Sequence, residues 1–109
     1  MEKRSGGIFE GTVDFKSIVD ESIGARDLML GFVSFPKGAR NKFHYHFKDQ
    51  VLYVTGGRGI VATEKEQHIV EAGDVVLIPG GERHSHGATK DSYFSHIFVC
   101  TAGDPGKWE

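Results

Sequence analysis

The chain has 109 residues, enough for one domain with one hydrophobic core. Hydrophobic residues make up 39% of it and charged residues 26%, which is typical of a folded globular protein and argues against disorder. The formal net charge is −2 and no run of Lys or Arg is present, which argues against nucleic acid or an anionic membrane as the partner.

The cellular location is indicated by the cysteine content and the N-terminal residues. Cys100 is the single cysteine, so no internal disulfide can form and a reducing compartment fits. Residues 1–7 carry charges with no apolar stretch behind them, unlike a secretory signal, and no apolar run is long enough to span a bilayer. We therefore expect a cytoplasmic protein.

In chain order, residues 8–20 are expected to form an entering strand followed by a helical turn, and residues 27–35 a strand. Apolar residues occupy both faces of this strand, so we expect both faces to be covered. Seven further short strands are expected at residues 40–46, 50–55, 59–63, 67–70, 74–78, 84–87 and 93–99.

Turn-forming residues separate these strands, and residues 103–109 are expected to be a loop. The expected turns include residues 56–59, 64–66, 71–74 and 79–81. Fifteen glycines against three prolines suit such tight turns, and no amphipathic helix longer than about two turns is apparent. The pattern predicts an all-β barrel or sandwich that forms a single domain over residues 1–109.

Histidine is unusually frequent, with six in the chain, and His44 and His46 form the clearest functional signal. In a strand, residues two apart point to the same face, so the two imidazoles would project side by side. Two adjacent imidazoles can chelate one metal ion.

Two later residues can complete this site. Gln50 opens the next expected strand, and its side chain can turn back beside the histidine pair. His84 follows an apolar strand and a Pro-Gly turn that reverses the chain toward the pair. Asp49 is a rival oxygen ligand, but strand alternation places it on the opposite face, so we favour Gln50.

The spacing of these residues resembles the two sequence motifs of the cupin superfamily. The first motif is a glycine, five residues, His-x-His, three or four residues, a Glu, six residues and a further glycine. It is matched by Gly38, His44, His46, Gln50 and Gly57, with Gln in place of Glu. The second is a glycine, five residues, Pro-x-Gly, two residues and His; it is matched by Gly73, Pro79, Gly81 and His84. Ala88 stands where many cupins have Asn.

The resemblance implies a double-stranded β-helix, the cupin jelly-roll barrel, with a core over about residues 27–100 flanked by an N-terminal arm and a C-terminal tail. It also implies one divalent metal ion per chain held by His44, His46, Gln50 and His84. Manganese or iron is favoured, and Ni, Co, Zn and Cu stay open. A neutral Gln in place of Glu would leave a divalent ion with about two residual positive charges rather than about one, which favours anionic ligands.

Two other histidines are candidates for catalysis. His86 has the strand parity of His84 and is expected beside the metal ligands, where it would orient one of them. His96 lies between phenylalanines in an expected strand, so burial would keep it neutral and able to transfer a proton; a structural histidine bonded to a carbonyl is the alternative. An apolar pocket is expected to be lined by Val33, Phe35, Leu52, Val54, Phe94, Phe98 and Cys100.

Within the superfamily, the chain resembles small cupins with three histidines and one glutamine, a group that includes bacterial manganese-dependent hydroxynitrile lyases, and also quercetinase-like dioxygenases. We therefore expect a metal-dependent enzyme, a lyase or a dioxygenase, that acts on a small molecule. A cupin that only binds or senses a small ligand is the alternative. The class also implies a homodimer.

Overall fold

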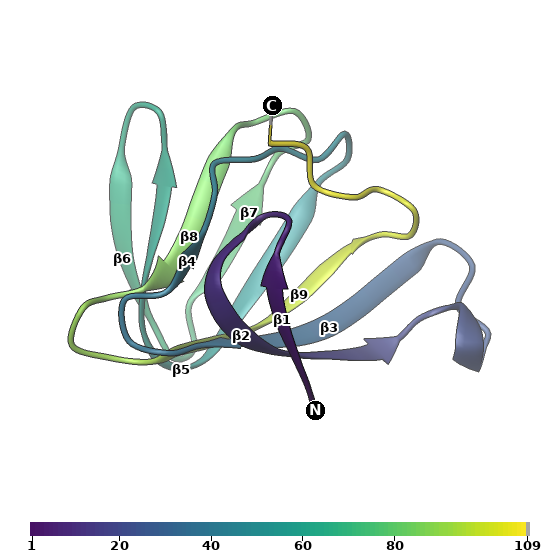
Figure 1. Cartoon of the computed structure of the whole chain (residues 1–109). Helices are drawn as coiled ribbons and strands as arrows, with labels where there is room; N and C mark the ends of the chain where they lie inside the picture. The colour runs from purple at the N-terminus through teal and green to yellow at the C-terminus, as the bar shows by residue number, and fades with distance from the viewer. Residues whose placement is uncertain (109) are drawn as a thin grey trace.

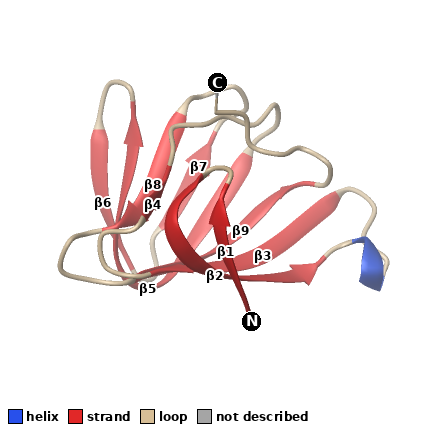
Figure 2. Cartoon of the chain, viewed as in Figure 1, coloured by secondary structure: helices blue, strands red, loops and turns tan. Residues whose placement is uncertain are grey.

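The computed structural model of the chain describes residues 1–108. Its strands are β1 (Glu2–Gly6), β2 (Phe9–Val19), β3 (Leu28–Phe35), β4 (Arg40–Asn41), β5 (Gln50–Thr63), β6 (Gln67–Glu71), β7 (Val75–Ile78), β8 (His84–Ala88) and β9 (Phe94–Thr101). One 3-10 turn, Glu21–Ile23, is the helical element of residues 1–108 (Figure 2), and no helix there is long and apolar enough to cross a membrane.

Six of the strands close into a barrel, which confirms the predicted all-β cupin fold. Hydrogen-bonded neighbours run in the order β2, β3, β9, β5, β8 and β4, and β4 returns to pair with β2 (Figure 1). β1 extends the sheet beyond β2, while β6 and β7 pair with β5. Closure satisfies the strand edges that an open sheet would leave unpaired.

The core lies inside this barrel because alternate residues of each strand point inward. Phe35, Leu52, Val54 and Phe94 have no exposed surface, and they stack against one another where β3, β5 and β9 meet. The same inward face carries His84, His86 and His96, so polar side chains lie in an otherwise apolar interior.

The predicted turn at residues 56–59 is wrong: β5 runs unbroken through it. The strand register shifts between Val54 and Gly56, and Gly57 has a φ of 70°. This β-bulge is pressed against the segment before β9, because a Cβ on Gly57 would lie 1.9 Å from the carbonyl oxygen of Tyr93. Gly57, which contributed to the predicted turn, therefore marks a place where the backbone of β5 comes close to the backbone of Tyr93.

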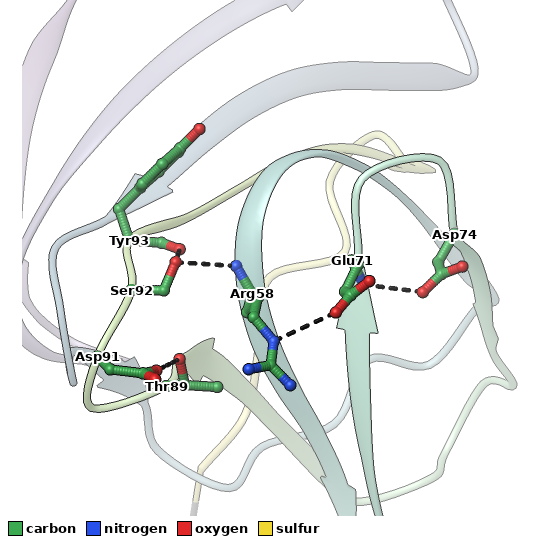
Figure 3. Close-up of polar contacts among 7 residues, drawn as sticks. All are labelled: Arg58, Glu71, Asp74, Thr89, Asp91, Ser92 and Tyr93. Atoms are coloured by element: carbon green, nitrogen blue, oxygen red, sulfur yellow. Dashed lines mark hydrogen bonds and ion pairs between the residues drawn. The ribbon is translucent and has the colours of Figure 1, made fainter.

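Polar contacts of Arg58, next to the bulge, connect β5 to its neighbours, as Figure 3 shows. The Arg58 backbone N–H donates to Ser92 Oγ (3.1 Å), and its guanidinium Nε pairs with Glu71 Oε1 (3.3 Å). The Glu71 N–H in turn donates to Asp74 Oδ2 (2.8 Å). One residue of the long strand thus joins the β6–β7 turn to the segment that enters β9.

The chain departs from the expected strands at two further places. The strand expected at residues 40–46 is limited to Arg40–Asn41. Further along this segment, His44 forms an isolated bridge with His84, and Tyr45 forms one with Lys107. β1 was not anticipated. β2 confirms the strand expected within residues 8–20, whereas the helical turn expected in that range lies just beyond it, at Glu21–Ile23. The other strands lie within two residues of their predicted bounds.

The strand expected to be covered on both faces, β3, is covered on one. The outer side chains of β3 continue across β9, β5 and β7 as two rows of neighbouring residues. One row is Phe32, Ile97, Tyr53 and Val75, and the other is Leu30, Val99, Val51 and Leu77. Val75 and Leu77 are 66% and 62% exposed, and none of the eight is charged. We call these eight residues the outer apolar face.

The bulge yields a test of the fold. Replacing Gly57 with Ala should lower the free energy of unfolding by about 3 kcal/mol, because it combines a positive φ with a backbone clash. Urea denaturation measures the change. Gly7→Ala is the matched control, since Gly7 has a φ of 57° and open space around it; it should cost about 1 kcal/mol. Equal losses in the two variants would contradict the clash.

Candidate metal centre

The two histidine segments of the sequence meet through a backbone bridge. The N–H of His44 donates to the carbonyl of His84 at 2.9 Å, and the N–H of His84 donates to the carbonyl of His44 at 2.9 Å. Paired residues of antiparallel strands project their side chains to the same face, and the two ring centroids lie 4.4 Å apart. His46 lies on that face as well, with its ring centroid 5.4 Å from that of His44.

Each of these three imidazoles is oriented by a backbone carbonyl. His44 Nδ1 donates to the Lys42 carbonyl (2.6 Å), His84 Nδ1 donates to the Glu82 carbonyl (3.0 Å), and His46 Nδ1 donates to the Asp104 carbonyl (2.7 Å). A proton on Nδ1 leaves the lone pair on Nε2 free for a metal ion. The Nε2 atom of His84 is buried and has no hydrogen-bond partner.

Gln50 lines the same cavity as His44 and His46 and carries an oxygen as its candidate ligand atom. It is the first residue of β5 and is 7% exposed, and its Oε1 is buried without a hydrogen-bond donor. Such an unsatisfied oxygen costs about 1–3 kcal/mol, a cost that a bound cation would remove. Asp49, the rival ligand, instead accepts a hydrogen bond from the Gly80 N–H (2.9 Å). The donor set of His44, His46, Gln50 and His84 therefore fits a divalent metal ion.

His86 also lies at this site. His44, His84 and His86 each place a ligand nitrogen within 4.8 Å of the others, so distance alone allows these three to hold an ion. The hydrogen bonds of His86 differ, however, because the Asn41 amide nitrogen lies 3.1 Å from its Nε2 and 3.3 Å from its Nδ1. The amide is oriented by its Oδ1, which accepts the His86 N–H (2.8 Å), so it donates to the imidazole and occupies a lone pair.

His96 lies deeper, on β9. It is 1% exposed, and neither ring nitrogen has a hydrogen-bond partner. Its ring centroid is 4.9 Å from that of His86, 5.3 Å from that of Phe94 and 5.9 Å from that of Phe35. His96 is among the residues that line the cavity described below, although both of its ring nitrogens are themselves buried.

Burial controls the protonation of these histidines. Desolvation lowers the pKa of His44 to about 4, helped by the neighbouring His84, and lowers the pKa of His96 to about 4 as well. Burial also lowers the pKa of His84, and it lowers that of His86 well below its usual range. All four are therefore neutral near pH 7, which is the form that binds metals and accepts protons.

A cavity of about 380 Å³ opens onto the cluster. Three of the seven side chains expected to line a pocket, Val33, Phe98 and Cys100, line this cavity. The other four, Phe35, Leu52, Val54 and Phe94, have no exposed surface and form the packed core. Additional lining comes from the N-terminal strands and from the segment after β9: Ile8, Phe9, Phe15, Pro105, Gly106 and Trp108.

Two residues of the site carried no signal in the sequence. Asn41 is 1% exposed and contacts His86 across a separation of 45 residues. Asp104 contacts His46 from 58 residues away, in a tail expected to be only a loop. Neither belongs to a periodic or spaced pattern, so only the folded chain reveals them.

Two characterised relatives share parts of the sequence. The chain is 39% identical over 70 residues to an (R)-mandelonitrile lyase from Granulicella tundricola, a match covering 62% of this chain and 52% of the relative. It is 40% identical over 45 residues to an acireductone dioxygenase from Sulfurihydrogenibium, covering 38% of this chain and 25% of the relative. The matched region thus spans about half of the lyase and a quarter of the dioxygenase.

Solved structures share the whole fold. A cupin-like protein from Thermotoga maritima superposes with a TM-score of 0.90 at 34% identity, covering 98% of this chain and 83% of that one. A polyketide cyclase from Streptomyces resistomycificus gives a TM-score of 0.81 at 18% identity, covering 87% and 69%, and so shares the fold alone.

The family assignment follows from the barrel, the two histidine segments and these relatives together. The cupin domain model matches residues 31–100, which include both segments and well over half of the chain. This chain belongs to the cupin family.

Proposed function

We propose that His44, His46, Gln50 and His84 hold one divalent metal ion, and that the protein is a metal-dependent enzyme acting on a small molecule. One observation carries this proposal. The buried Gln50 Oε1 has no hydrogen-bond donor, while three neighbouring imidazoles are turned by backbone carbonyls so that Nε2 is free. Manganese or iron suits this mixed set of nitrogen and amide-oxygen ligands.

The ligand set indicates the class of substrate. An imidazole binds a metal in its neutral form and the amide of Gln50 carries no charge, so a bound divalent ion would keep about two positive charges and act as a Lewis acid toward an anion or a substrate oxygen. The cavity, of about 380 Å³, has room for a small molecule, and its lining is mostly apolar, with polar groups that include those of Asn41, His86 and His96. A small, partly apolar substrate that is anionic or releases an anion matches both features.

We favour lyase chemistry of the hydroxynitrile type, in which a cyanohydrin breaks into an aldehyde and cyanide. His96 is the group that would take the hydroxyl proton, because burial keeps it neutral and it is among the residues that line the cavity. His86 would be held in place by Asn41 and would pack against His96. The matched relative named as a mandelonitrile lyase supports this choice.

Dioxygenase chemistry is the second candidate, supported by the matched segment of the acireductone dioxygenase. There the apolar wall would hold an enolic substrate, and oxygen uptake would be the readout. A non-catalytic binding cupin would show neither cyanide release nor oxygen uptake and would still hold its ligand. A cytoplasmic location stays a prediction.

We further propose that a second copy of the chain covers the outer apolar face. Its eight positions carry no charge, so two copies related by a twofold axis can meet there without like-charge repulsion. Contiguous exposed apolar residues such as Val75, Leu77 and Tyr53 are typical of an interaction surface. The proposed homodimer would bury Val75 and Leu77, the two residues most exposed on this face.

The metal centre predicts one ion per chain. Untagged protein should contain one equivalent of manganese or iron by elemental analysis. His84→Ala should lose at least nine-tenths of this metal, and Gln50→Ala should lose about half of it. His68→Ala is the matched control, because His68 is exposed and pairs only with Glu66; its metal content should equal that of the unmodified protein. Full metal content in His84→Ala would contradict the ligand set.

The proton role of His96 predicts a loss of turnover without a loss of metal. His96→Ala should lower kcat for mandelonitrile cleavage at least a hundredfold, since general bases contribute about 10²–10⁴-fold. Benzaldehyde absorbance and released cyanide measure the rate, and elemental analysis checks the metal. Unchanged cleavage in this variant would remove His96 from the mechanism; oxygen uptake without cyanide release in the unmodified protein would favour the dioxygenase.

The dimer proposal predicts a change of molecular mass. The unmodified protein should elute at about twice the chain mass of 12.0 kDa at micromolar concentration, and Leu77→Glu should elute as a monomer. Ile69→Glu is the matched control, because Ile69 is an exposed apolar residue on β6 outside the outer apolar face, and it should stay dimeric. Elution of the unmodified protein as a monomer would contradict the proposal.

A further inference from the structure

The segment after β9 runs back over the metal centre. Figure 1 shows this segment, residues 102–108, crossing above the barrel to the loop that precedes β5. Tyr45 and Lys107 exchange two backbone hydrogen bonds, both 2.9 Å long, and so pair the segment with the His44–His46 stretch. We call residues 102–108 the strap. Its backbone therefore lies beside two of the proposed metal ligands.

Asp104 is the residue through which the strap holds the ligand loop. Its carbonyl oxygen accepts the Nδ1–H of His46 at 2.7 Å. Its carboxylate accepts two neighbouring backbone N–H groups, that of Phe47 on Oδ1 (3.0 Å) and that of Lys48 on Oδ2 (2.8 Å). One residue thus orients the imidazole and also holds the backbone that carries it.

The other two imidazoles do not depend on the strap in this way. The Nδ1 atoms of His44 and His84 donate to carbonyls two residues earlier in their own segments, those of Lys42 and Glu82. The backbones of these two histidines are also bonded to each other. His46 has no such local carbonyl, and the acceptor for its ring lies 58 residues away.

We propose that Asp104 is a positioning residue of the metal centre: through His46 it sets how tightly the ion is held. This inference rests on the proposed metal centre and deepens it. The carboxylate fixes the turn at residues 47–48, the turn fixes the backbone of His46, and the Asp104 carbonyl selects the Nδ1–H tautomer with Nε2 free. Removing the carboxylate would release the turn and let the imidazole swing away from the ion.

The strap also restricts the space around His46. A Cβ added to Gly106 would lie 3.1 Å from His44 Cδ2, 3.3 Å from Ile8 Cγ2 and 3.6 Å from His46 Cε1. Pro105 and Trp108 line the same cavity, and the Lys42 ammonium lies 5.6 Å from the centre of the Trp108 ring. Displacement of Asp104 would therefore disturb a packed wall as well as one hydrogen bond.

A double-mutant cycle on Mn²⁺ affinity tests the proposal. The variants are Asp104→Ala, His46→Ala and the two together, and the Kd for Mn²⁺ is measured by competition with a chelating dye. Asp104→Ala should weaken binding about tenfold, as expected when a group that orients a ligand is removed. In the His46→Ala background the same change should alter the Kd less than twofold, because its effect passes through His46.

Controls separate positioning from a general loss of structure. Asp20→Ala removes a carboxylate that accepts the Ser22 N–H (2.9 Å) at the 3-10 turn, away from the centre, and should leave the Kd unchanged. Asp104→Asn keeps one of the two acceptor oxygens that hold the Phe47 and Lys48 N–H groups, so its Kd should lie between those of the unmodified protein and Asp104→Ala. Melting temperatures of the metal-free proteins report folding independently of the ion.

The outcomes distinguish the two proposals. An unchanged Kd in Asp104→Ala, or an equal loss in both backgrounds, would overturn the positioning role while leaving the metal centre intact. Failure of the unmodified protein to bind Mn²⁺, Fe²⁺, Co²⁺, Ni²⁺ or Zn²⁺ would overturn the metal centre and the inference with it. A loss of affinity that disappears in the His46→Ala background supports both.

Discussion

The backbone pair between His44 and His84 is the constraint on which the rest of the site depends. Two hydrogen bonds join residues 40 positions apart, and their imidazoles consequently project together into the barrel. His46 follows from the period of two along the extended chain, and Gln50 from the start of β5 just beyond the turn. The sequence motifs thus describe one local strand pairing and the side chains on and next to it.

Neutrality is the chemical character of this site. Burial lowers the pKa values of His44 and His84 and keeps both imidazoles uncharged, and the proposed oxygen ligand, Gln50, is an amide rather than a carboxylate. The nearest fixed negative charge on the strap, the Asp104 carboxylate, is bonded to backbone N–H groups of Phe47 and Lys48. The protein would therefore neutralise little of the positive charge of a cation bound here, and that charge would attract an incoming ligand.

Local periodicity explains what could be read from the sequence, and long-range contact explains what could not. Strand alternation and motif spacing were sufficient to predict the barrel and to single out His44, His46 and His84. They failed at Gly57, because a bulge and a turn both require positive φ and only the neighbouring chain at Tyr93 distinguishes them. Asn41 acts through a contact that no short window of sequence contains.

The same limit applies to the outer surface of the sheet. Apolar residues on both sides of β3 predicted cover on both faces, whereas the side chains of Leu30 and Phe32 stay half-exposed within the single chain. Apolar residues on a strand face look the same in the sequence whether that face is buried in the core of its own chain or in an interface with another chain. Only the folded monomer shows which of the two faces the core already covers.

The bond between His46 and Asp104 also links the proposed centre to the order in which the chain is made. The proposed ligands His44, His46, Gln50 and His84 all precede Asp104 by twenty residues or more. The barrel, however, closes only with β9, which lies between β3 and β5 and ends at Thr101. Barrel closure and the arrival of Asp104 therefore nearly coincide, so under the proposed positioning role the four ligands would be brought together and fixed in one step rather than one after another.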